Sequence, residues 1–188
     1  MTATHRIEHH ALSELVQRAW GETPRRHKLE EIRASVTRFG YARPLVIDDT
    51  SGRVVVGNGL LAALLIARQD DQAAPQRVTV REDGEWTVPT VHIALQEGEW
   101  KAYSISDTRT EELGEWDSER LIHELQQIAE SDLGLDGIGF TNEDLEVLLA
   151  QQGGALPESF AEIPSADGAP DSKPRSVTCP HCGETFEP

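Results

Sequence analysis

The chain has little of what marks secreted, disulfide-stapled or membrane-spanning proteins. Its 188 residues include only two cysteines, and aromatic residues make up 5% of the total. No apolar run approaches the roughly 20 residues that a membrane-spanning helix needs, and residues 1–10 lack the apolar core of a signal peptide. These absences argue against a disulfide framework and a membrane protein. They predict a cytoplasmic protein with one globular core plus appendages.

Basic charge is also scarce, which is awkward for a nucleic-acid binder. The formal net charge is −16 at pH 7. However, residues 1–60 carry nine Lys and Arg against seven Asp and Glu, whereas residues 61–188 carry eight against twenty-six. The first segment therefore supports two interpretations: a basic face that could contact phosphates, or an ordinary solvated helix face with Glu30 and Glu31 interspersed. The members of this face are Arg18, Arg25, Arg26, Lys28, Arg33, Arg38 and Arg43.

The hydrophobic pattern interleaves short strands with helices, which favours an α+β fold with a small mixed sheet. The predicted strands are 5–9, 44–47, 53–56 and a hairpin over 78–93 that turns near Asp83-Gly84. The predicted helices are 28–38, 60–68, 97–106, 117–130 and 141–151, the last starting with a Thr-x-x-Asp capping pattern. From 153 to 176, Gly, Pro, Ser, Ala and Asp dominate, so we expect a flexible linker before the tail 177–188.

One segment has the pattern of a phosphate-binding turn. RVVVGNGLLAALLIAR, residues 53–68, predicts a strand, a turn at Gly57-Asn58-Gly59 and then a helix. The first N–H groups of a helix are unpaired and attract anions, and glycine lets a phosphate approach the backbone. The alternative interpretation is a tight turn whose small residues serve close packing.

In context this segment resembles the ParB/sulfiredoxin domain family. The resemblance rests on PRRHKLEEIRASVTRFGYARPLVID, GRVVVGNGLLAAL and VPTVHIAL, in that order. Downstream, YSISDTRTEELGEWDSERLIHEL and GIGFTNEDLEVLL resemble a branch found in phage and mobile-element proteins that are often linked to DNA methyltransferases. The resemblance covers roughly residues 5 to 151. It implies a ParB/sulfiredoxin-like domain over 1–107 and a helical extension over 108–152 that packs on it.

The resemblance also implies site residues. Arg25, Arg26 and His27 match the basic entry motif of the family, and Gly57, Asn58 and Gly59 match its phosphate-facing turn. Leu60 departs from the pattern, because the family usually has Arg there and Arg presents a fork of donors suited to phosphate. Sulfiredoxin chemistry needs a Cys in this turn, and position 58 is Asn.

Asp107 and Arg109 match an Asp-Asn-Arg motif of that branch, with Thr108 in place of Asn. The resemblance implies that they shape the site. The alternative is a surface ion pair or a helix end. Trp116-Asp117 indicates an apolar anchor followed by a helix N-cap.

The tail has a zinc-knuckle sequence, with Cys179 and Cys182 two residues apart. Structural zinc usually takes four protein ligands, so this half-site is incomplete. Two chains could share one four-thiolate site as a homodimer, or a remote His9, His10 or His27 could contribute; a degenerate knuckle without metal is the alternative.

Three functions follow. The first is a ParB-like DNA- or nucleotide-associated binding protein, an accessory to DNA modification or maintenance in a phage or mobile element, with a DNA methyltransferase as a candidate partner. The second is an enzyme, a nuclease or nucleotide hydrolase using the Gly57–Gly59 turn, against which Leu60 argues. The third is an acidic adaptor that binds proteins and not nucleic acid.

Overall fold

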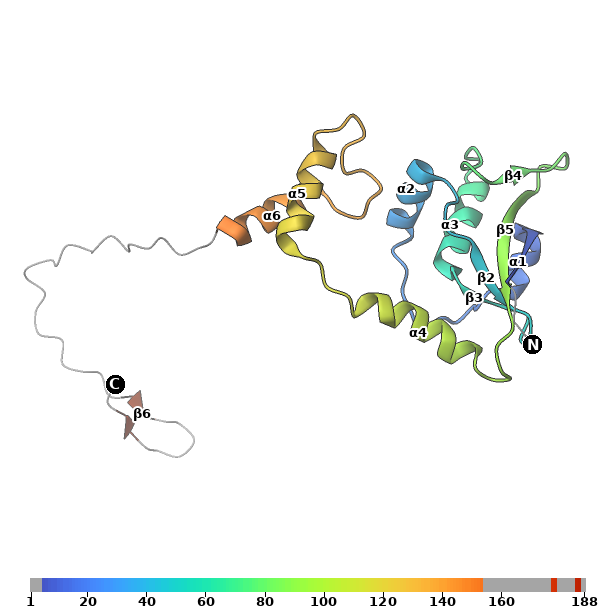
Figure 1. Ribbon diagram of the computed structural model, residues 1–188, viewed down its shortest axis with the longest axis horizontal. Coiled ribbons are helices and arrows are strands. Elements are labelled where there is room, and N and C mark those ends of the chain that lie inside the picture. Colours follow the sequence, from blue (N-terminus) through green and yellow to red (C-terminus); the bar gives the residue numbers. More distant parts are fainter. Residues whose placement is uncertain (1–4, 154–176, 179–184, 187–188) are drawn as a thin grey trace, which may run out of the picture. The chain divides into compact units, whose positions relative to one another are not determined.

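The predicted α+β class is confirmed by the structure, a computed structural model that describes residues 5–153, 177–178 and 185–186. Figure 1 shows a small mixed sheet with helices around it. The chain divides into two compact units, 1–153 and 154–188. The elements of the first unit are β1 (Arg6–Ala11), α1 (Leu12–Arg18), α2 (Leu29–Phe39), β2 (Leu45–Asp48), β3 (Arg53–Val56), α3 (Asn58–Gln69), β4 (Thr79–Val80), β5 (Trp86–Ile93), α4 (Trp100–Glu112), α5 (Ser118–Ala129) and α6 (Asn142–Gly153).

The sheet is mixed because its longest strand, β5, has neighbours of both directions. The strand order is β1-β5-β2-β3, and β4 pairs with β5 off this path. β5 runs antiparallel to β1 and β4 and parallel to β2, while β2 and β3 form an antiparallel pair. Alternate residues of β5, from Trp86 to His92, are buried, which is the period-2 pattern of a strand with one covered face.

The main core lies between this face of the sheet and helices α1 and α3. Leu12 and Leu15 of α1 are fully buried, as are Leu61 and Leu64 of α3. A fully buried leucine contributes on the order of 2 kcal/mol of transfer free energy, so these side chains fix α3 against the sheet. The core members are Leu12, Leu15, Val36, Tyr41, Leu45, Ile47, Val54, Leu61, Leu64, Ala67, Trp86 and Val88.

Three sequence predictions need correction. Helix α1 was not predicted, because its seven residues follow β1 without a breaker or a capping side chain. Helix α3 begins at Asn58 and not at Leu60, because Gly57 alone makes the turn. Helix α4 begins at Trp100 and continues to Glu112, so Asp107 and Arg109 lie inside a helix. Residues 107 and 108, where the sequence places a domain boundary, both lie in α4, and the division into those two domains stays a prediction.

Helices α5 and α6 form a second, smaller core around Ile122, Leu125, Leu135 and Leu145. Both helix starts are capped as the sequence predicts. Asp117 accepts a hydrogen bond from the Arg120 N–H. The Thr141 hydroxyl accepts one from the Asp144 N–H, and the Asp144 carboxylate accepts one from the Thr141 N–H in return.

The second unit contributes two short strands, β6 (Val177–Thr178) and β7 (Thr185–Phe186), which pair antiparallel. Cys179 and Cys182 lie outside the described residues, as does the predicted linker 154–176. The zinc knuckle and a zinc site shared by two chains therefore stay predictions. Among the helices that the structure describes, none combines the length and the apolar character needed to cross a bilayer.

Candidate functional site

A cavity of about 710 Å³ opens at the N-terminus of α3. Gly57, the residue before the helix, has φ +92°, a left-handed conformation that favours glycine. A Cβ at this position would lie 2.4 Å from Cδ2 of the fully buried Leu45, so that side chain would have to move within the core. No side chain caps this end of α3. The N–H groups of Asn58, Gly59 and Leu60 have no acceptor within the helix, and these three residues line the cavity.

The side chain of Asn58 links the start of α3 to two other segments by hydrogen bonds. Its Oδ1 accepts a hydrogen bond of 2.9 Å from the Trp20 N–H, and its Nδ2 donates one of 3.0 Å to the Val54 carbonyl. The Trp20 ring packs edge-on against Trp100 of α4, with centroids 5.1 Å apart. Through these contacts of Trp20, the segment between α1 and α2 is held against the start of α3 and against α4. His27 belongs to the same segment.

His27 packs directly on the first turn of α3. A Cβ on Gly59 would lie 2.6 Å from His27 Nδ1, so the imidazole needs a glycine beneath it. Its Nε2 is buried and has no hydrogen-bond partner among the residues that the structure describes. Burial lowers the pKa of His27, and the positive charge of Arg25 lowers it further. Both effects favour the neutral imidazole, and His27 lines the cavity where it packs against Gly59.

Carboxylates of α4 face the basic residues of the cavity. Arg25 Nη1 lies 2.6 Å from Glu112 Oε1, and both side chains are 47% exposed. Arg43 Nη2 lies 3.6 Å from Asp107 Oδ2. Exposed ion pairs of this kind contribute about 0–1 kcal/mol, because water screens them. The guanidinium groups are therefore held near the cavity by contacts that a stronger anion can replace.

The structure brings together most of the residues that the sequence singled out. Arg25, His27, Gly57, Asn58, Gly59, Leu60 and Asp107 all line the cavity. Arg109 lines an adjoining cavity of about 300 Å³ and lies 3.5 Å from Glu112. Arg26 is exposed and lines neither cavity.

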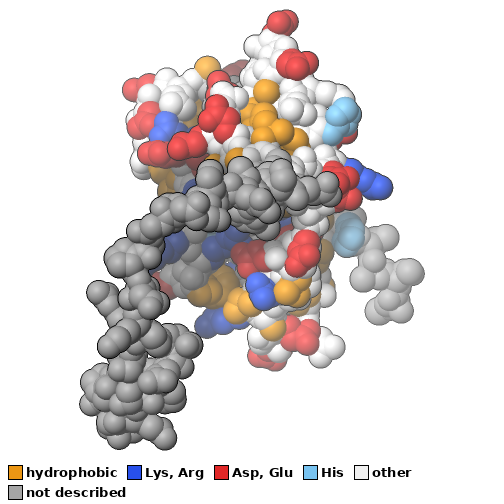
Figure 2. All heavy atoms as spheres, turned by 90° about the vertical axis from the view of Figure 1, so that its left-hand side faces the viewer, with side chains coloured by type: hydrophobic (Ala, Val, Ile, Leu, Met, Phe, Trp, Pro, Cys, Tyr) orange, Lys and Arg blue, Asp and Glu red, His pale blue; other side chains and the backbone are white. Residues whose placement is uncertain are grey.

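Sequence reasoning did not assign Glu112 or Arg43 to the site. Glu112 lies on α4, and its acidic end, Glu111-Glu112, looks like any solvated helix end. Arg43 was placed on a general basic face. On the face shown in Figure 2, acidic side chains lie in both the upper and the lower part, and several Lys and Arg side chains lie between them.

A group of side chains that could bind a metal ion lies outside the cavity. Among the described residues, one group of His and carboxylate side chains lies close enough together to hold an ion, Glu8, His10 and His92. These residues belong to β1 and β5 and line neither cavity.

Comparison with known proteins gives a likeness among solved structures. No family model matches the sequence, and no curated protein matches it. Among solved structures, the chain is similar to the C-terminally truncated chromosome-partitioning protein ParB from Caulobacter crescentus, in a crystal structure of its complex with CTP-γ-S. The TM-score is 0.45 and the sequence identity 16%, over 77% of this chain and 71% of that chain.

Proposed function

We propose that the cavity at the start of α3 binds the phosphate groups of a nucleotide, and that the protein is a ParB-like, nucleotide- or DNA-associated binding protein. One observation carries the proposal: the uncapped N-terminus of α3 follows a left-handed glycine and opens on a cavity where Arg25 and His27 converge. Unpaired N–H groups and the helix dipole favour an anion here.

A phosphate would replace the carboxylates that now face the arginines. Arg25 would leave Glu112 for a phosphate oxygen, with which it can form two parallel hydrogen bonds. The exchange is favourable because the Arg25–Glu112 pair is exposed, and little free energy is lost when it breaks. Arg43, paired with Asp107 at 3.6 Å, would provide a second cation.

Leu60 changes how this cavity would hold its ligand. The side chain is half-buried, lines the cavity and packs against the main core. An apolar wall at this position removes one guanidinium and leaves the backbone N–H groups, Arg25 and Arg43 as donors. We therefore expect weaker phosphate binding than an arginine at position 60 would allow.

Binding without hydrolysis is the proposal, because two of the three carboxylates that line the cavity, Asp107 and Glu112, are paired with arginines. Asp48, the last residue of β2, lies outside the cavity lining. Asp48 is 1% exposed, and its carboxylate accepts hydrogen bonds from the Ser51 hydroxyl and the N–H groups of Ser51, Thr50 and Leu95. A carboxylate held in this way is a turn-stabilising group and a poor base or metal ligand. A nuclease or nucleotide hydrolase would need other acids.

DNA is the second proposed ligand, through the exposed basic residues of the first segment. Arg33 and Arg38 are engaged, by Asp70 and by the carbonyls of Gly134 and Asp136 respectively. Arg26 and Lys28 are exposed and lie one and three residues after Arg25. A role as an accessory to DNA modification in a phage or mobile element, next to a DNA methyltransferase, rests on the sequence resemblance.

Calorimetric titration tests both ligands. The full-length protein is titrated with CTP and ATP in the presence of Mg²⁺, and separately with a short duplex, at low and moderate salt. We expect saturable nucleotide binding that Arg25→Ala weakens about tenfold, the loss of one charge-assisted contact. Arg81→Ala, an exposed arginine in the β4–β5 hairpin, serves as the control and leaves binding unchanged.

The outcomes separate the functions. Duplex binding that disappears with salt supports the DNA interface. If neither nucleotide produces binding heat at either salt concentration, the phosphate site is rejected. The acidic protein-binding adaptor then remains as the proposed function. Equal losses in the Arg25 and Arg81 variants would reject this cavity as the place of binding.

A further inference from the structure

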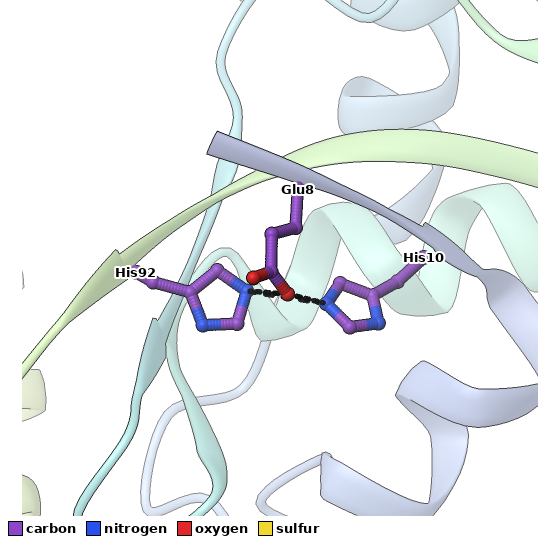
Figure 3. A group of neighbouring side chains, drawn as sticks. All are labelled: Glu8, His10 and His92. Carbon is purple, nitrogen blue, oxygen red and sulfur yellow. Dashed lines mark hydrogen bonds and ion pairs between the residues drawn. The ribbon is translucent and has the colours of Figure 1, made fainter. Parts of the chain in front are cut away.

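We propose that Glu8, His10 and His92 form a binding site for one zinc ion on the β1–β5 strand pair, independent of the phosphate cavity. Figure 3 shows the three side chains pointing toward one another, with the glutamate between the two imidazole rings. Two histidines and one carboxylate are a common protein ligand set for zinc, with a fourth position left for water.

The distances between the ligand atoms suit a tetrahedral ion. His10 Nε2 and His92 Nε2 are 3.1 Å apart. Glu8 Oε2 lies 3.5 Å from the first of these nitrogens and 3.6 Å from the second. Ligand atoms about 2.0–2.1 Å from a tetrahedral zinc are about 3.3 Å apart, so an ion just above this triangle reaches all three.

Strand pairing creates this arrangement. Arg6, Glu8 and His10 alternate along β1 and therefore face one side of the sheet. On β5, His92 faces the same side, because Arg6 pairs with His92 and Glu8 with Thr90. The side chain of His92 is 3% exposed and that of His10 is 11%, while Glu8 at 41% leaves the site open to solvent.

Carboxylates orient both imidazole rings for metal binding. His92 Nδ1 lies 2.7 Å from Asp49 Oδ1, and His10 Nδ1 lies 3.3 Å from Glu14 Oε2. An ionised carboxylate only accepts hydrogen bonds, so each Nδ1 carries the proton and donates. Each Nε2 then presents a lone pair, which is the tautomer that a metal ligand needs.

With this tautomer assignment, the Nε2 lone pairs of His10 and His92 lie 3.1 Å apart, and the Thr90 hydroxyl oxygen lies 3.2 Å from His92 Nε2. Arg6 Nη2 lies 3.3 Å from His92 Nδ1, on the other side of the ring. A cation between the two Nε2 atoms removes the repulsion between their lone pairs, and the surrounding charges favour one. The carboxylates of Glu8 and Asp49 both pair with Arg6, and Asp49 also contacts His92. Arg6 binds Glu8 through Oε1 and leaves Oε2 directed at the histidines.

The test uses the full chain and removes the tail thiols first. In Cys179→Ser/Cys182→Ser, any zinc bound cannot come from the predicted knuckle. After chelator treatment, this double variant is titrated with Zn²⁺ and with Co²⁺. We expect one ion per chain, and a cobalt spectrum without a thiolate charge-transfer band.

Single changes in the double variant identify the ligands. We expect His10→Ala to weaken zinc binding by at least about 100-fold and Glu8→Gln by about tenfold. His9→Ala is the matched control, because His9 is exposed and lies between Glu8 and His10 on the opposite face of β1. Circular dichroism of the metal-free variants confirms that each is folded.

Two results would overturn the site. One is a double variant that binds no zinc. The other is a double variant whose affinity falls equally for His9→Ala and His10→Ala, which would indicate nonspecific surface binding. Neither result bears on nucleotide binding, so the two proposals fail separately.

Discussion

The two candidate sites of this molecule are held in opposite ways. The ligand atoms of the strand cluster are buried imidazole nitrogens, each oriented by a carboxylate, within 3.1–3.6 Å of one another and of Glu8. The charged groups of the cavity are exposed guanidinium groups in ion pairs with α4, and they lie beside the backbone at the start of α3. Ligand atoms that are already close together, as in the strand cluster, suit one small cation. Ion pairs that can exchange partners beside a helix end, as in the cavity, suit a larger anion.

The largest effect we expect is at the glycine on which the cavity depends. Gly57→Ala should destabilise the fold by about 2–4 kcal/mol, because its φ is +92° and the new Cβ would meet Leu45. Gly52→Ala is the matched control: φ there is +69°, but nothing lies within 4 Å of an added Cβ. Urea unfolding of both variants measures the difference. Equal losses would show that packing against Leu45 contributes nothing.

A somewhat smaller loss of stability is expected from a substitution in the turn between β2 and β3, next to the strand cluster. Burial alone would raise the pKa of Asp48, but hydrogen bonds from Ser51, Leu95 and Thr50 lower it below the usual value. Asp48→Asn should cost about 2 kcal/mol near neutral pH, because an amide nitrogen would face N–H donors.

The pH dependence of that loss has a defined sign. A lowered pKa in the folded state adds stability above the unfolded pKa, near 4, and this stability disappears as the pH falls through the folded value. The difference between wild type and Asp48→Asn should therefore shrink below about pH 4. Asp132→Asn, at an exposed position, is the control. A pH-independent difference would contradict the assignment.

The next largest effect is expected when the carboxylate that orients His92 is replaced. Asp49→Asn should weaken zinc binding about tenfold, because the amide is a weaker acceptor for His92 Nδ1. Glu14→Gln should have a smaller effect, since its oxygen lies 3.3 Å from His10. Zinc titration in the cysteine-free variant checks the order. The reverse order would show that the carboxylates do not act through the rings.

The smallest expected effect is a gain. Glu112→Gln removes the carboxylate that competes with phosphate for Arg25, so nucleotide affinity should rise about two- to fivefold. Glu115→Gln, an exposed acid just beyond α4, should leave it unchanged. Calorimetry measures both, and a loss of affinity in Glu112→Gln would mean that Glu112 helps to position Arg25.

Local patterns predicted the strand, the glycine turn and the helix that border the cavity, and they did not predict the strand cluster. The sequence from Arg53 to Arg68 predicted a strand, a glycine turn and a helix, because each of these patterns depends only on neighbouring residues. His10 and His92 meet only through the pairing of β1 with β5, which no local pattern specifies. Glu112 joined the site because α4 extends two turns beyond its predicted end at residue 106.

Amide NMR shifts of the ¹⁵N-labelled protein, titrated with CTP and Mg²⁺, test the central claim most directly. We predict that nucleotide shifts the amide signals of Asn58, Gly59 and Leu60 and leaves those of β1 unchanged. Zinc should do the opposite in the same sample. A nucleotide that leaves the first turn of α3 unshifted, or shifts only distant residues, would contradict a phosphate site at this helix end.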